Sequence, residues 1–75
     1  MEENGASRPV ATLWQLTFND ERMCCNIYRD GRSLQLRVES PHTVMVDEPF
    51  ELMPRMLART RALRASLLRQ GWRDS

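Results

Sequence analysis

Residues 23–39, MCCNIYRDGRSLQLRVE, decide the fold of this chain. Apolar and polar side chains alternate on both sides of Asp30 and Gly31, which is the period of a half-buried β-strand. Asp-Gly between two alternating segments favours a tight hairpin, because a type I′ turn needs positive φ at both central positions. With these two residues as the loop, Cys25 opposes Leu36, and the apolar sets of both strands share one face.

The neighbouring segments extend this hairpin into a meander. Residues before it alternate in the same way, and a turn centred on Asp20 and Glu21 pairs them with the next strand. A short β-branched segment after the hairpin predicts a further strand at the sheet edge, ended by an acidic pair and a proline. The expected strands are residues 10–18, 23–29, 32–39 and 43–46.

After the strands, apolar residues recur at helical spacing over residues 54–70. Pro54 is expected to open this helix, because its missing N–H costs nothing at the first position. Gly71 is the predicted stop, in the left-handed position of a Schellman cap, with Trp72 folding back on Leu67. The predicted core is Trp14, Leu16, Phe18, Cys25, Ile27, Leu34, Leu36 and Val38 from the strands, with Met56, Leu57, Leu63, Leu67 and Leu68 from the helix.

These elements predict an α+β fold, a three- or four-stranded antiparallel β-meander with one C-terminal α-helix packed on one face. Residues 1–9 contain few apolar side chains and are expected to form a disordered N-terminal arm, with residues 10–75 as a single small domain. A chain of this length buries only about 60% of the surface that it exposes when unfolded. Self-association as a homodimer is an expected source of further stability.

Charge is distributed unevenly along the chain. Residues 54–75 contain six arginines and one acid, a formal charge of +5, whereas residues 1–53 contain five arginines and nine acids, a charge of −4. All eleven basic residues are arginine, a residue suited to bidentate binding of phosphate or carboxylate, although codon bias in a GC-rich genome gives the same composition. On a helical wheel, an exposed arginine ridge is formed by Arg55, Arg59, Arg69 and Arg73.

The arginine ridge is a candidate site for an anion or a partner. Its counterion is either an external polyanion, a partner subunit, or an acid of the same fold, the candidates being Glu39, Asp47, Glu48 and Glu51. A solvated helix face is the alternative interpretation. Arg64, at the margin of the apolar stripe, is expected either to extend over the core to water or to pair with an acid across a subunit boundary.

The sheet face away from the helix is a second candidate surface. Tyr28 and Arg37 are predicted to lie there among polar side chains as possible ligand contacts. In outline, this arrangement resembles the platforms on which single-stranded nucleic acids stack. A polar outer face is also the default for an antiparallel sheet, and one aromatic residue is fewer than such platforms use.

Few residues offer metal or covalent chemistry. Cys24 and Cys25 are adjacent, so in a strand they point to opposite faces and are expected to form neither a disulfide nor a metal site. We expect Cys25 in the core and Cys24 partly exposed. His42, the sole histidine, lies beside Pro41 without a recognisable nucleophile or base nearby in the sequence. No catalytic, cofactor-binding or metal-ligating residues are therefore expected.

Together these features predict a non-enzymatic protein-interaction module, whose partner is a second copy of itself or another protein. The alternative is a nucleic-acid-binding protein that uses the arginine ridge. No apolar run approaches the about 20 residues needed to cross a bilayer, and reduced cysteines suit a reducing compartment. A cytoplasmic location without a membrane partner is therefore expected.

Overall fold

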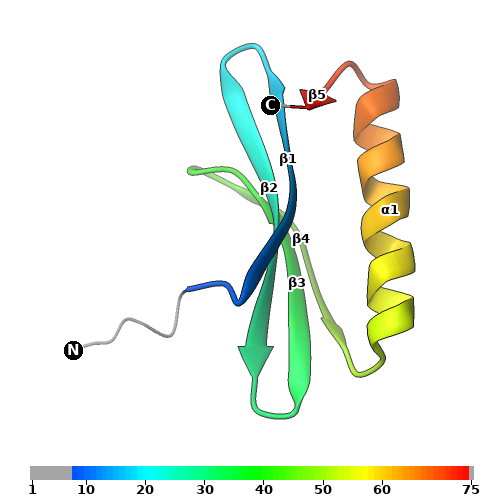
Figure 1. Ribbon diagram of the computed structural model, residues 1–75. Helices are drawn as coiled ribbons and strands as arrows, with labels where there is room; N and C mark the ends of the chain where they lie inside the picture. Colours follow the sequence, from blue (N-terminus) through cyan, green and yellow to red (C-terminus); the bar gives the residue numbers. More distant parts are fainter. Residues whose placement is uncertain (1–7, 75) are drawn as a thin grey trace, which may run out of the picture.

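The computed structural model describes residues 8–74, so most of the predicted arm at residues 1–9 lies outside the described residues. A five-stranded antiparallel sheet in the order β4-β3-β2-β1-β5 is covered on one face by a single helix (Figure 1). The predicted α+β class, with its meander and C-terminal helix, is confirmed. The elements are β1 Ala11–Phe18, β2 Glu21–Asp30, β3 Ser33–Glu39, β4 Val44–Phe50, α1 Met53–Arg69 and β5 Arg73–Asp74.

Each hairpin turn lies one residue away from its predicted position. The β1–β2 loop consists of Asn19 and Asp20, whose φ values of 49° and 68° are the two positive angles of a type I′ turn. The β2–β3 loop consists of Gly31 and Arg32, with Gly31 at φ 64°. Glycine at the first loop position fits a type II′ turn. Both predicted loops were therefore wrong by one residue.

Moving a loop by one residue moves the strand pairing by two. Cys25 pairs with Val38 instead of Leu36, and Leu16 pairs with Met23 instead of Cys25. Because side chains alternate with a period of two, this displacement leaves the paired side chains on their predicted faces, except at the start of β1, where an irregularity between Thr12 and Trp14 interrupts the alternation. The register was wrong, but the division into two faces was right.

β4 is longer than predicted, because it continues through the acidic pair and Pro49 to Phe50. The prediction that these residues end the strand was wrong. Pro49 is tolerated because β4 lies at the sheet edge, where a missing N–H need not break a ladder on both sides. Glu48 pairs with the buried Leu36 of β3, so its side chain lies on the helix side of the sheet.

Gly71 stops the helix as predicted: α1 ends at Arg69, and Gly71 follows the cap residue Gln70 with φ 107°. The Trp72 N–H donates to the Leu67 carbonyl at 3.1 Å, and the Gly71 N–H donates to the Leu68 carbonyl at 3.1 Å. These two bonds define the Schellman motif and confirm the predicted cap. At its other end, α1 begins one residue before Pro54.

A fifth strand follows the cap and was not predicted. β5 has only two residues, Arg73 and Asp74, which pair with Thr17 and Leu16 of β1. The chain therefore passes over the sheet as α1, from β4 at one edge to β5 at the other (Figure 1).

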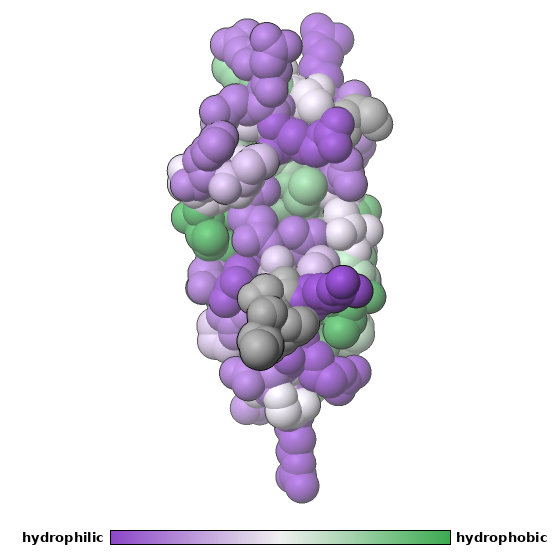
Figure 2. Space-filling view, turned by 90° about the vertical axis from the view of Figure 1, so that its left-hand side faces the viewer, coloured by the Kyte–Doolittle hydropathy of each residue, from purple (hydrophilic) through white to green (hydrophobic). Residues whose placement is uncertain are grey.

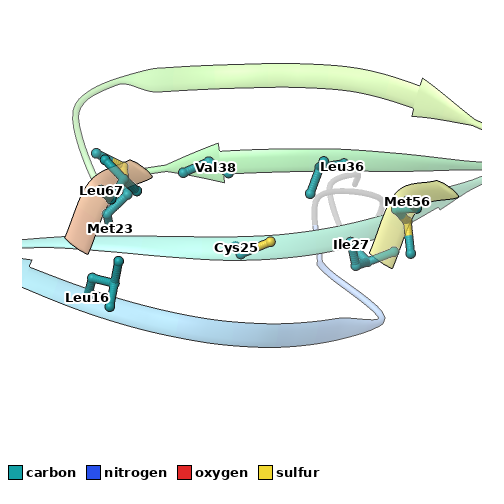
Figure 3. Packing of buried hydrophobic residues seen from close by; sticks show 8 residues of the cluster. All are labelled: Leu16, Met23, Cys25, Ile27, Leu36, Val38, Met56 and Leu67. Atoms are coloured by element: carbon teal, nitrogen blue, oxygen red, sulfur yellow. The ribbon is translucent and has the colours of Figure 1, made fainter. Parts of the chain in front are cut away.

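One layer of apolar side chains between the sheet and α1 forms the core. In Figure 3, Met56 and Leu67 of the helix lie at the two ends of the row of strand residues. The prediction was wrong for Phe18, which is 41% exposed, and for Leu68, which is 37% exposed. Thr60 is buried instead, and its hydroxyl donates to the Leu57 carbonyl at 2.8 Å. The buried apolar residues are Leu16, Met23, Cys25, Ile27, Leu36, Val38, Met56 and Leu67.

Candidate functional site

The arginine ridge predicted on the helix is not continuous. Arg73 lies in β5, because Gly71 turns the chain back onto the sheet before this position, so its assignment to the helix was wrong. Arg59 is engaged with an acid of the same chain. Arg55 and Arg69 are exposed on α1, and neither forms an ion pair with an acid among residues 8–74. The four arginines are therefore not brought together on one surface.

Arg59 makes a two-pronged contact with Glu48 of β4. Its Nε and Nη2 each donate to a different Glu48 carboxylate oxygen at 3.0 Å. The hydrogen bond from Arg59 holds the pKa of Glu48 below its usual value, and the same bond raises the pKa of Arg59. One of the acids that the sequence offered as a counterion is thus the actual partner.

Arg64 makes the corresponding contact on the other flank of the helix. Its Nη2 donates to both Asp74 carboxylate oxygens of β5, at 2.7 Å and 2.6 Å. At 100° per residue, Arg59 and Arg64 lie about 70° to either side of the buried stripe. The two ion pairs therefore join α1 to the two edge strands of the sheet. Arg64 therefore pairs with an acid of its own chain, and this pair is partly exposed to water.

The outer sheet face is hydrophilic over most of its area (Figure 2). Tyr28 and Arg37 lie side by side there, as predicted, with the guanidinium carbon 4.8 Å from the ring centroid. The Tyr28 hydroxyl donates to Glu39 Oε2, which also accepts a bond of 2.7 Å from Asn26 Nδ2. Partial burial, followed by the bond to Glu39, raises the pKa of Tyr28.

This network continues to both sides and involves most of the polar groups of the face. Arg37 Nε forms an ion pair with Asp47 Oδ1 of β4 at 3.5 Å, and Gln35 Nε2 donates a hydrogen bond to the same oxygen. The Thr12 hydroxyl donates to Asn26 Oδ1 at 2.7 Å. Since Arg37 stacks on Tyr28, a nucleic-acid base would have to displace it to stack on that side of the ring. The predicted platform is thus partly closed by its own side chains.

The two cysteines lie on opposite faces, as predicted. Cys25 is fully buried, and burial, reinforced by neighbouring Cys24, raises its pKa to about 12. Cys24 is partly buried, and both thiols are free. His42 is exposed, and its backbone N–H donates to Ser40 Oγ at 3.3 Å. Within residues 8–74, no three side chains of the usual ligand types are placed to hold a metal ion.

The outer edge of β4 is the surface that these elements leave open. Val44 and Met45 are 50% and 44% exposed on this edge strand. Its two acids, Asp47 and Glu48, contact arginines of the same chain. The sequence indicated an open edge near these residues, but no sequence pattern showed that its acids would be neutralised internally. That neutralisation depends on contacts with β3 and α1.

Comparison of the chain with protein-family models, with curated proteins and with solved structures finds no match. The helix formed within residues 8–74, α1, does not have the length and apolar character that crossing a bilayer requires.

Proposed function

We propose that the protein is a non-enzymatic interaction module that associates with a second copy of itself along β4. The observation that supports this proposal is the open edge of β4, with Val44 and Met45 exposed. Unpaired N–H and C=O groups on an edge strand are a template for another strand. A cytoplasmic location accompanies the proposal, because both cysteines are free thiols.

The charges on β4 favour this pairing. Acids on an edge strand usually keep two copies apart by like-charge repulsion. Here Asp47 lies beside Arg37, and Glu48 is bound by Arg59. Two β4 edges can therefore approach with little repulsion between their carboxylates.

The small core also favours association. Among residues 8–74, one helix covers a five-stranded sheet, and the buried apolar cluster consists of eight residues. A domain of this size usually needs a further source of stability. Antiparallel pairing of two β4 strands about a two-fold axis would extend the sheet across both copies. Pro49 has no N–H to donate, so the pairing is confined to the part of β4 that precedes it.

Sedimentation equilibrium tests the proposal. The unmodified protein should be a dimer at high micromolar concentration, and Met45→Lys should be a monomer, because a charge would be placed within the joined edge. Leu13→Lys is the matched control, since Leu13 is 39% exposed on β1, toward the opposite edge of the sheet. A monomeric parent protein in low salt, or dissociation by Leu13→Lys alone, would reject the β4 interface.

Nucleic-acid binding is the second candidate function, and the exposed arginines of α1 favour it. Arg55, Arg61 and Arg69 are exposed on a helix that contains no acid. Titration with labelled single- and double-stranded oligonucleotides tests this function, with binding expected to weaken steeply as salt is added. Replacing Arg55 and Arg69 by alanine should weaken binding more than replacing Arg59, whose guanidinium is engaged with Glu48. Equal effects of these replacements, or no binding at low salt, would exclude the helix as the contact surface.

A further inference from the structure

We infer that the protein has a binding site for a phosphate monoester group. Arg22, Thr17 and Arg73 form this site. Thr17 lies on β1 and pairs with Arg22 of β2 on one side and with Arg73 of β5 on the other. Residues paired across antiparallel strands present their side chains on the same face, with Cβ atoms about 5 Å apart. Two arginines therefore flank one hydroxyl on the outer sheet face.

A solvent-open surface depression of about 610 Å³ lies at this position, and all three residues line it. This volume falls within the range of about 300–1,000 Å³ that is typical of small-ligand sites. The remaining lining residues come from the end of β1, from the β1–β2 turn and from the cap that follows the helix. They are Phe18, Asn19, Asp20 and Gly71.

The two arginines have positive charge to offer to a ligand. Neither forms an ion pair with an acid among residues 8–74, where the ion pairs use Arg37, Arg59 and Arg64. Asp20 is the one acid among the residues that line the depression, so the lining has a formal charge of +1. Asp74, next to Arg73, pairs with the buried Leu16 and contacts the helix on the other side of the sheet.

The donor groups suit a phosphate better than a carboxylate. Each guanidinium can donate two parallel hydrogen bonds to an oxyanion, and Thr17 and Asn19 add a hydroxyl and an amide. A carboxylate has two oxygens to receive these donors, whereas a phosphate monoester has three and a charge of about −1.5 to −2 at neutral pH. Donors from three strands and a turn therefore match a tetrahedral anion.

The site is separate from the proposed dimer interface. It lies between β5, β1 and β2, whereas β4 is the opposite edge strand of the sheet. Loss of phosphate binding and loss of dimerisation can therefore be measured independently, and neither result implies the other.

Isothermal titration calorimetry with inorganic phosphate and adenosine monophosphate tests the inference, with adenosine as the ligand that lacks phosphate. Both phosphate ligands should bind saturably, and adenosine should not. Arg22→Gln and Arg73→Gln should each weaken binding by about ten- to a hundredfold, because each removes charge-assisted hydrogen bonds. Arg29→Gln is the matched control, since Arg29 is also exposed on β2 but opposes Leu34 on the helix side of the sheet.

A second measurement needs no variant. Titration of the unmodified protein with phosphate should shift the backbone amide resonances of Thr17, Arg22 and Arg73 more than that of Arg29 in nuclear magnetic resonance spectra. Equal weakening by Arg22→Gln and Arg29→Gln would show general charge attraction and overturn the site. Binding of adenosine as tightly as adenosine monophosphate would also overturn it, as would binding of a thymidine oligonucleotide without binding of either small phosphate.

Discussion

At Cys24 and Cys25, the alternation of a strand gives two neighbouring thiols different surroundings. Cys24 lies on the partly accessible outer face, whereas Cys25 is fully buried against the helix. Burial disfavours the charged thiolate of Cys25 relative to its neutral thiol. The pKa of Cys25 is therefore raised from 9.0 to about 12. This difference was predictable, because it depends on period-two alternation and not on register.

Stability should therefore fall in alkaline solution. Cys25 stays neutral in the folded state between pH 9 and about pH 12 but ionises when unfolded, so its stabilising contribution is complete below pH 9 and is lost as pH rises through this window. From pH 8 to pH 10, this thiol should lower the free energy of unfolding by about 1.4 kcal/mol. Urea denaturation at both pH values measures the change. Cys25→Val should reduce the difference in unfolding free energy between pH 8 and pH 10. An unchanged difference in this variant would assign the pH dependence to other groups. Tyr28 is one of them, because its raised pKa lowers stability in alkaline solution in the same direction.

Gly71 is the residue whose replacement should harm the helix end most. An alanine there would need φ near 107°, and its Cβ would lie 3.1 Å from Phe18 Cε1. The left-handed backbone alone costs about 1–2 kcal/mol, and the close contact adds to this. Gly31→Ala is the control, because Gly31 has φ 64° and no atom within 4 Å of the added Cβ. Thermal denaturation should show a larger loss for Gly71→Ala, and equal losses would contradict the contact with Phe18.

At the scale of elements, the sequence predicted which face each strand presents but not how the strands are aligned. Periodicity is unchanged when a strand moves by two residues, so the turn had to set the register. Asn19 and Asp20 form the first turn with positive φ at two residues that are not glycine, and Gly31 occupies the first rather than the second place of the next. β5 is shorter than any alternation pattern can reveal, and this explains why Arg73 was assigned to the helix.

The contact between α1 and β4 predicts different behaviour for two arginines on one helix. Arg59→Gln should lower the free energy of unfolding by up to about 1 kcal/mol, the usual limit for an exposed ion pair. Arg55→Gln should be neutral or slightly stabilising, because it removes a like-charge neighbour of Arg59 one turn away. Chemical denaturation of both variants measures these effects.

Salt and acid supply the controls for this ion pair. The cost of Arg59→Gln should shrink in 1 M salt, where the Debye length is about 3 Å. The lowered pKa of Glu48 means that the pair contributes above its ordinary value of 4.5 and is lost as pH falls through the folded-state pKa. A cost that persists in acid would point to packing of the arginine stem instead.

At the scale of the whole molecule, the opposite charges of the two halves meet in one of the described ion pairs, Arg59 with Glu48, whereas Arg64 pairs with Asp74 of its own half. Arginines of the C-terminal half meet an acid of β4 on one flank of the helix and an acid of β5 on the other. The sequence showed the imbalance but could not show which arginines were engaged, since that depends on which strands lie at the two edges. An anionic partner would encounter the arginines that are exposed and form no ion pair among residues 8–74.

Self-association should make the thermal stability depend on concentration. For a dimer that unfolds to separated chains, tenfold dilution removes about 1.4 kcal/mol per dimer, which corresponds to a fall in Tm of about 3–6 °C for a domain of this size. Calorimetry at two concentrations measures this shift. Met45→Lys should unfold at a Tm independent of concentration, and a concentration-independent Tm in the unmodified protein would contradict the dimer.

The place of α1 after β4 in the chain also has a consequence for synthesis. Every strand of the meander leaves the ribosome before the helix that covers it, and Leu67 follows Phe50 by 17 positions. At about 5–20 residues per second, the ribosome needs roughly 1–3 s to add that stretch. During this interval the newly made sheet has an uncovered apolar face, so the nascent chain is most exposed to aggregation and to chaperone binding just before its helix is complete.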